Sequence, residues 1–196
     1  MSNETPPISD FYTHGPALAN LPEDIRARIE EVQEKAGFVP NVFLLLAHKP
    51  DEFRAFFAYH DALMEVPGGL SKAEREMIVV ATSGINQCHY CVIAHGAILR
   101  VRARNPLIAD QVAINYRKAD ISTRQRAMLD FAVQVSTASH TVDDAQRQAL
   151  HAHGFSDDDI WNIIGIAAFF GMSNRMASAV SLRPNDEFYM LGRVAG

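Results

Sequence analysis

The chain has 196 residues, of which 48% are apolar and 21% charged, and its formal charge is −5 from 18 basic and 23 acidic residues. This length and apolar content suit one hydrophobic domain or two small ones. The mild acidity, with no basic stripe to follow phosphates, argues against a nucleic-acid partner. The strongest apolar run, 160–172, is shorter than the roughly 20 residues of a membrane-spanning helix, so no membrane partner is expected.

The first 20 residues are polar, contain prolines and lack the apolar core of a secretory signal. They predict an extended N-terminal arm over residues 1–20 and a cytoplasmic protein. In that compartment two closely spaced cysteines are more often catalytic than structural. Residues 21–196 are predicted to form a single all-helical domain.

Apolar residues recur at helical spacing along most of this domain, and no segment alternates with the period of two typical of strands. An all-α fold is therefore predicted. Its first helix starts at Pro22 and stops before Gly37, and the next carries the stripe from Phe53 to Leu63. A capping box at 71–74 opens the third, and a fourth continues to about Arg104. Further helices are predicted at 107–117, 122–137, 143–153 and 157–182.

Cys88 and Cys91 are the only cysteines of the chain, so its thiol chemistry lies in the segment Cys88-His89-Tyr90-Cys91. On a helix, positions 88, 91 and 95 share one face, which places His95 one turn after Cys91. Two sulfurs and one imidazole therefore form a single stripe on this helix.

A turn is predicted at 83–86, because Gly84 favours the end of one helix and Asn86 is a good N-cap for the next. Cys88 then lies in the first helical turn, where the helix dipole favours a thiolate. Glu76 precedes the midpoint of this turn by as many residues as His95 follows it. In an antiparallel helix pair the two lie level, about 14 Å from the turn.

A carboxylate beside His95 would fix the tautomer of the imidazole and raise its basicity. The pattern predicts a relay from Glu76 through His95 to Cys91, with Cys88 alongside. Which cysteine attacks stays open, because the dipole favours Cys88 and the relay favours Cys91.

Redox chemistry of the cysteine pair has two alternatives. Zinc accepts Cys, His and Glu ligands, but structural zinc sites usually use two ligand pairs from separate segments, and no second cysteine pair exists. An inert buried pair is the other alternative. His60, on the apolar face of its predicted helix, is interpreted as a core or interface histidine.

The spacing of Glu76, Cys88, Cys91 and His95 resembles the motif of alkylhydroperoxidase D (AhpD)-like proteins in the carboxymuconolactone decarboxylase superfamily. The segment 37–43 (GFVPNVF) and Asn174-Arg175 resemble its peroxidase-related branch. The resemblance spans about 21–182. It implies an AhpD-like helical fold, homo-oligomeric assembly, and no bound cofactor or metal. It also implies peroxide reduction that leaves a Cys88–Cys91 disulfide, which an external dithiol, such as a lipoyl group on a partner protein, reduces.

One residue departs from the AhpD motif. AhpD has a histidine immediately before its second cysteine, whereas this chain has Tyr90 there and His89 one position earlier. Their side chains point about 100° apart on a helix, so His89 cannot simply take over. Tyr90 and His89 are candidate auxiliary residues beside the predicted catalytic set of Cys91, Cys88, His95 and Glu76.

Segment 70–78 is similar to segment 121–129 at an offset of 51 residues. A repeat would divide the domain into an active half, about 21–105, and a non-catalytic half, about 106–183. The second copy then has Ala127, Ser139, Val142 and Gln146 at the positions of Glu76, Cys88, Cys91 and His95. Chance similarity between two capped amphipathic helices is the alternative.

Together these patterns predict a thiol-dependent peroxidase that reduces hydrogen peroxide or organic peroxides. Three other functions remain open at this point: a decarboxylase-type lyase with the same fold, a zinc-binding module, and a catalytically silent oligomeric scaffold.

Overall fold

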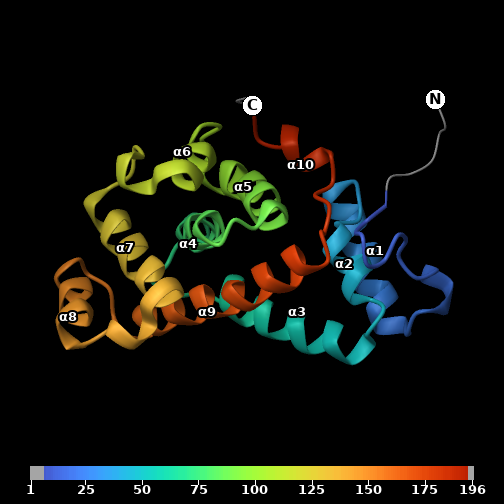
Figure 1. Cartoon of the computed structure of the whole chain (residues 1–196), viewed down its shortest axis with the longest axis horizontal. Helices are drawn as coiled ribbons and strands as arrows, with labels where there is room; N and C mark the ends of the chain where they lie inside the picture. The colour runs from blue at the N-terminus through green and yellow to red at the C-terminus, as the bar shows by residue number, and fades with distance from the viewer. Residues whose placement is uncertain (1–6, 194–196) are drawn as a thin grey trace.

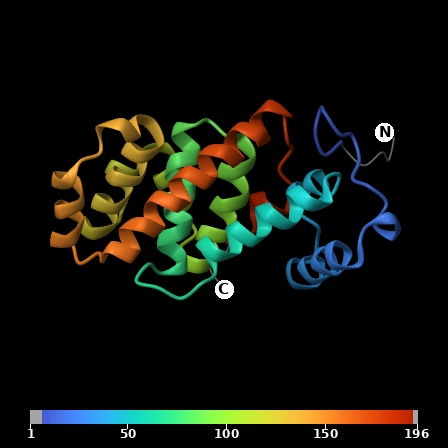
Figure 2. The ribbon, with the colours of Figure 1, turned by 90° about the horizontal axis from the view of Figure 1, so that it is seen from below.

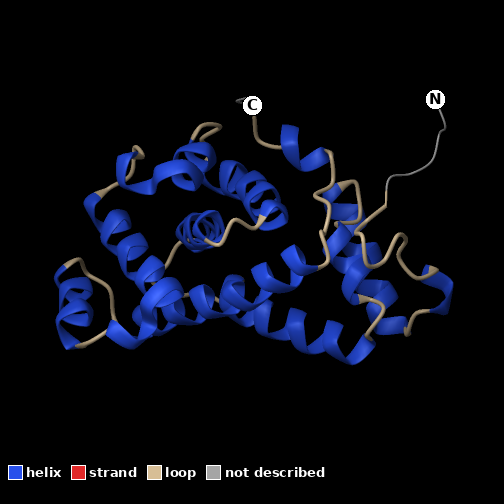
Figure 3. Cartoon of the chain, viewed as in Figure 1, coloured by secondary structure: helices blue, strands red, loops and turns tan. Residues whose placement is uncertain are grey.

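The computed structural model describes residues 7–193, and the regular structure within this range is entirely helical (Figure 3). The predicted all-α fold is confirmed. The α-helices are α1 (Glu23–Ala36), α2 (Asn41–Leu46), α3 (Pro50–Met64), α4 (Lys72–Ile85), α5 (His89–Ala103), α6 (Ile108–Asn115), α7 (Thr123–Ala138), α8 (Asp144–Ala152), α9 (Asp157–Ala179) and α10 (Glu187–Met190). Short 3-10 helices cover Leu18–Asn20, Tyr116–Lys118 and Ser139–Thr141.

Helix α4 lies at the centre of the molecule, where Figure 1 shows it end on. It packs against α5, α6, α7 and α9, and its residues from Met77 to Ala81 are at most 5% exposed. The middle of this central helix therefore carries its side chains, Glu76 among them, into the interior. Helix α9 extends from the α7–α8 side of the molecule past α4 toward the N-terminal helices (Figure 2).

The predicted N-terminal arm is described from residue 7 onward, and its first six residues lie outside the described range. Residues 7–17 form no helix. They are attached to the segment after α9, because the Asp10 N–H donates to the Val180 carbonyl at 3.1 Å and the Arg183 N–H donates to the Ile8 carbonyl at 2.8 Å. Ile8 is buried by this contact.

The helix boundaries agree with the sequence prediction to within a few residues, but α2 and α10 were not predicted. Both are short, with six and four residues, so neither is long enough to display a helical stripe. The two similar segments open α4 and α7, each with a capping box, at Ser71 and at Ser122. The repeat itself stays a prediction.

The end of α4 was predicted wrongly at Gly84, which does not stop the helix. Helix α4 continues through it to Ile85. Gly84 instead allows α4 and α6 to approach each other closely, because a Cβ atom at this position would lie 2.7 Å from the Ala113 carbonyl oxygen of α6. Helices α4 and α6 can therefore pack closely only with glycine here.

The start of α5 also differs from the prediction. Asn86 is not the N-cap, because its side-chain amide donates to the Asn174 carboxamide oxygen at 2.9 Å. Gln87 then adopts a left-handed backbone with a φ of 55°, and Cys88 becomes the N-cap of α5. The sequence predicted Cys88 within the first turn of the helix, whereas in the structure it is the residue just before that turn. Its sulfur faces the free N–H groups at the helix start.

Candidate functional site

Both cysteines lie at the start of α5, are free thiols and are buried, with 1% of Cys88 and 2% of Cys91 exposed. As the N-cap residue, Cys88 accepts a hydrogen bond at its Sγ from the Cys91 backbone N–H at 3.4 Å. Serine and asparagine cap helices through their oxygens, and a thiolate is a suitable acceptor in the same place. The helix start thus stabilises negative charge on Cys88.

The two thiols differ sharply in acidity. Hydrogen bonding from the Cys91 thiol, followed by the Cys91 backbone N–H, lowers the pKa of Cys88 to about 6 against the opposing effect of burial. The same hydrogen bond to Cys88, together with burial, raises the pKa of Cys91. Of the two thiols, Cys88 is therefore the one that more readily carries a negative charge.

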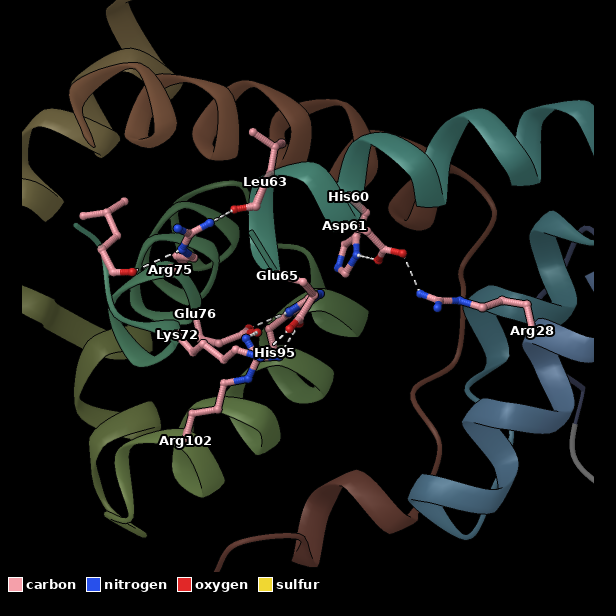
Figure 4. A network of polar contacts seen from close by, with 11 residues as sticks. Arg28, His60, Asp61, Leu63, Glu65, Lys72, Arg75, Glu76, His95 and Arg102 are labelled. Atoms are coloured by element: carbon pink, nitrogen blue, oxygen red, sulfur yellow. Dashed lines mark hydrogen bonds and ion pairs between the residues drawn. The ribbon is translucent and has the colours of Figure 1, made fainter. Parts of the chain in front are cut away.

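Glu76 of α4 and His95 of α5 are in contact, as the sequence predicted: the His95 Nδ1 lies 2.8 Å from the Glu76 Oε2 (Figure 4). Glu76 is only 2% exposed and His95 13%. A carboxylate at Nδ1 favours the tautomer with the proton on that nitrogen. The Nε2 of His95 is then free to accept a proton.

An ion-pair network holds the Glu76 carboxylate from the other side. The Arg102 Nη1 lies 3.2 Å from Glu76 Oε1, and Arg102 also pairs with Glu65 at 2.6 Å. Glu65 in turn pairs with Lys72 at 2.5 Å (Figure 4). An adjacent guanidinium favours the ionised form of a carboxyl group. Glu76 therefore faces His95 as an anion.

Cys91 and His95 line one cavity of about 140 Å³ between α2, α3, α5 and α9. Its walls are mainly apolar and aromatic. They include Phe43, Phe56, Phe57, Phe170 and Phe188. The His95 ring packs edge-on against Phe170, with 4.7 Å between ring centroids. The cavity can hold a small, largely apolar molecule beside the Cys91 sulfur.

Cys88 lines a different recess, a surface groove of about 380 Å³ between the start of α5 and the segment after α9. Polar side chains contribute to its lining, among them Gln87, His89, Ser178, Ser181 and Arg183. Neither Cys91 nor His95 lines this groove, and Cys88 does not line the cavity. The two cysteines therefore border different recesses.

The candidate auxiliary residues are divided between these recesses. Tyr90 is buried and lines both, and its hydroxyl accepts a hydrogen bond from the Val42 N–H at 3.3 Å. Burial raises the pKa of Tyr90, so the phenol stays protonated. His89 is exposed in the groove, with its Nε2 3.0 Å from the Tyr189 hydroxyl. His89 thus lies outside the cavity that contains His95.

His60 is a cavity residue for which the sequence suggested no function. It projects from α3 into the cavity that contains Cys91 and His95. Its ring also packs against Phe57 and Phe170. The only sign of it in the sequence was that His60 is the one imidazole in the apolar stripe from Phe53 to Leu63.

Asn174 and Arg175, which belong to the sequence resemblance, have structural contacts. The buried Asn174 side chain donates to the Ser83 hydroxyl at 2.9 Å and accepts from Asn86 at 2.9 Å. It thereby joins α9 to the end of α4 just before the cysteines. Arg175 is exposed and donates to the Gly171 carbonyl of its own helix.

Two further properties concern the part of the chain that the structure describes. Among residues 7–193, no three His, Cys, Asp or Glu side chains gather as ligands of a metal ion would. In the same range, each helix is too short or too polar to cross a bilayer.

Comparison with known proteins identifies the family. Residues 50–106 match the carboxymuconolactone decarboxylase family. A peroxidase-related protein with an alkylhydroperoxidase AhpD core, from Ralstonia eutropha JMP134, is 67% identical; the match covers 97% of this chain and 99% of that chain, with a TM-score of 0.94. A peroxidase-related protein from Silicibacter sp. TM1040 is 40% identical, with coverage of 98% and 100% and a TM-score of 0.88. No curated protein matches the sequence.

The chain belongs to the carboxymuconolactone decarboxylase family and, within it, to the AhpD-like, peroxidase-related proteins. The predicted AhpD-like fold is thereby confirmed.

Proposed function

We propose that the protein is a thiol-dependent peroxidase in which Cys91 and Cys88 form a redox couple and Glu76 and His95 transfer protons. One observation carries this proposal. Cys91 shares an apolar cavity with a histidine that a buried carboxylate orients, while a second, acidic thiol lies within hydrogen-bonding distance of Cys91. This arrangement provides a nucleophile, a base and a resolving thiol.

The first step oxidises Cys91. His95 Nε2 accepts the Cys91 proton, and the thiolate attacks the terminal oxygen of the hydroperoxide. The O–O bond breaks as the S–O bond forms, so that the sulfur becomes a sulfenic acid. The departing alkoxide takes the proton from His95 and leaves as an alcohol, or as water when the substrate is hydrogen peroxide. Glu76 stabilises the imidazolium between these two transfers.

The second step forms the disulfide. The Cys88 thiolate attacks the Cys91 sulfenic sulfur, and hydroxide leaves and is protonated to water. The Cys91 backbone N–H at the helix start, which donates to Cys88 Sγ, favours this thiolate after the Cys91 thiol has been oxidised. The acidity of Cys88 is therefore assigned to resolution, although it would equally support a first attack by Cys88. Sulfenic acid trapping separates these two orders.

An external dithiol completes the cycle. We infer that it approaches through the groove at Cys88, because this recess opens to the surface and the cavity at Cys91 is small and aromatic. One thiolate of the reductant attacks Cys88 and releases Cys91, and its second thiol resolves the mixed disulfide. A reduced lipoyl (dihydrolipoyl) group, free or on a partner protein, has the required pair of thiols and becomes the cyclic disulfide as it reduces the protein.

We also propose a homo-oligomer. Several large apolar side chains are exposed in this single chain, among them Leu107, Ile114 and Trp161, with 61%, 86% and 73% exposed. Such residues commonly mark subunit interfaces when they are contiguous. Light scattering after size-exclusion chromatography gives the subunit number, and a monomer at micromolar concentration would contradict this proposal.

The test of function is a free-thiol count with intact mass, before and after one equivalent of hydrogen peroxide or cumene hydroperoxide. We expect the loss of both thiols and of two hydrogen atoms, reversed by dihydrolipoamide, followed by sustained peroxide consumption when both reagents are present. The double variant Cys88→Ser/Cys91→Ser is the matched control.

Different results would favour the other functions. Two thiols that remain reduced in excess peroxide would contradict the peroxidase. Stoichiometric zinc in the purified protein would then favour the metal-binding alternative. Turnover of a lactone acid that survives in the double serine variant would favour a decarboxylase-type lyase.

A further inference from the structure

His60 forms a wall of the cavity at Cys91 and has no part in the steps above. It comes from α3, whereas Cys91 and His95 come from α5, yet all three line the same space of about 140 Å³. The rings of His60 and His95 both pack against Phe170, at centroid distances of 6.3 and 4.7 Å. The cavity therefore contains two imidazoles beside one thiol.

The contacts of His60 define which of its ring nitrogens carries the proton. Its Nδ1 lies 3.0 Å from Asp61 Oδ1, and Asp61 Oδ2 accepts a hydrogen bond from Arg28 Nη2 at 2.8 Å (Figure 4). The Arg28 cation favours an ionised Asp61, which can only accept, so Nδ1 carries the proton. Within residues 7–193, Nε2 has no hydrogen-bond partner, and its lone pair is available to a ligand.

The surroundings of His60 favour its neutral form. Burial is the main effect and lowers the pKa of His60, and the nearby His95 acts in the same direction; Asp61 and Glu76 oppose them. Arg28, across Asp61, is a further cation on this side. A neutral imidazole with the proton on Nδ1 offers a hydrogen-bond acceptor at Nε2, not a second cation.

A hydroperoxide has a single hydrogen-bond donor, the O–H of its terminal oxygen, and this is the oxygen that a thiolate must attack. We propose that Nε2 of His60 accepts a hydrogen bond from this O–H group and thereby directs the terminal oxygen to the Cys91 sulfur. The other peroxide oxygen, which is bonded to carbon, is then free to receive the proton that His95 returns. This assignment rests on the proposed peroxidase function and makes His60 a substrate-binding residue of the same site.

The proton balance agrees with this role. The terminal oxygen keeps its hydrogen when it becomes the sulfenic acid, so His60 gains and loses no proton. The proton that leaves with the alcohol is the one that His95 took from Cys91. The two histidines thus perform different tasks, one orienting the electrophilic oxygen and the other protonating the leaving oxygen.

The test compares His60→Leu, which removes the acceptor, with His60→Gln, whose amide oxygen can accept in nearly the same position. Single-turnover oxidation of the thiols by tert-butyl hydroperoxide is followed by thiol loss and intact mass. We expect His60→Leu to be slower by about tenfold, the effect of one lost hydrogen bond, and His60→Gln to recover most of the rate. His153→Leu, at the end of α8, is the matched control, and its thiols should be oxidised at the wild-type rate.

Two further rates separate substrate binding from packing. Alkylation of Cys88 and reduction of the disulfide by dihydrolipoamide should be the same in both His60 variants and the wild type. If His60→Leu does not fold, His60→Phe replaces it, because a ring keeps the contacts with Phe57 and Phe170. Wild-type rates in the leucine or phenylalanine variant, or equal slowing in His60→Gln, would overturn the role of His60 alone. A wild type that peroxide does not oxidise would overturn the peroxidase proposal as well.

Discussion

The two recesses beside the cysteine pair differ in size and polarity, although the sulfurs belong to residues only three apart. The cavity at Cys91 is small and aromatic and contains two histidines, whereas the groove at Cys88 is larger, polar and open to the surface. The difference in acidity follows the same division, because the pKa of Cys88 is lowered and that of Cys91 is raised. In the proposed mechanism, this single helix start would separate an oxidation side from a reduction side.

Serine substitutions test this division most strongly. Both Cys91→Ser and Cys88→Ser should lose peroxide turnover by at least about 10³-fold, because each lacks a member of the couple. Only Cys88→Ser should still be oxidised once, and a sulfenic acid trap should then label Cys91. Serine caps helices well, so Cys88→Ser should keep the start of α5. A label at Cys88 in Cys91→Ser, with none at Cys91 in Cys88→Ser, would reverse the assignment.

The substitution Glu76→Gln tests the proton relay. The amide cannot stabilise a charged His95, so we expect Cys91 oxidation to slow by about 10²-fold, within the usual range for general acid–base catalysis. Stopped-flow measurement of single-turnover oxidation gives this rate. Cys88 alkylation should hardly change, because Glu76 lies on the cavity side. Equal losses in both reactions would indicate a general disturbance of the fold.

The pH dependence of alkylation tests the difference in acidity. A lowered pKa means that Cys88 is a thiolate above about pH 6 and loses its reactivity as the pH falls through that value. Iodoacetamide labelling of Cys88, followed by peptide mass spectrometry, should show this midpoint. In Cys91→Ala the main cause of the low pKa is removed, and the midpoint should rise by about one pH unit or more. An unchanged midpoint would assign the acidity to the helix start alone.

The smallest effect is expected from Ser178→Ala in the groove. The Ser178 hydroxyl is a minor contributor to the low pKa of Cys88. Its removal should raise the alkylation midpoint by only a few tenths of a pH unit, below the effect of a typical neutral hydrogen bond. Oxidation by peroxide should stay at the wild-type rate. A large loss of oxidation would mean that the groove also admits the peroxide.

The contact between Glu76 and His95 could be predicted because it depends only on two adjacent helices and the turn between them. The turn lies later than predicted, because α4 continues to Ile85 and α5 starts only at His89, so the two residues are not equally far from it. Their side chains still meet across the helix pair. The N-cap could not be predicted from local preference. Asn86 has the stronger capping propensity, but Asn174 of α9 binds its side chain and leaves the cap to Cys88.

The role of His60 could not be predicted for a similar reason. It lies 35 positions before His95, on another helix, and the two meet only because α3 and α5 both border one cavity. The Tyr90 hydroxyl likewise finds its partner at Val42, on the unpredicted α2. Local patterns thus predict contacts across one turn. Those that close the cavity depend on the packing of α2, α3 and α9.

The position of Glu76 on the central helix has a consequence for local unfolding. Backbone amides near Glu76 are covered on several sides, so they should exchange with deuterium only when the whole domain opens. The segment around Gln87, with its left-handed backbone at the rim of the groove, should exchange through small local openings. We therefore expect Cys88, the thiol proposed to meet the reductant, to become exposed while the carboxylate behind the histidine remains in place.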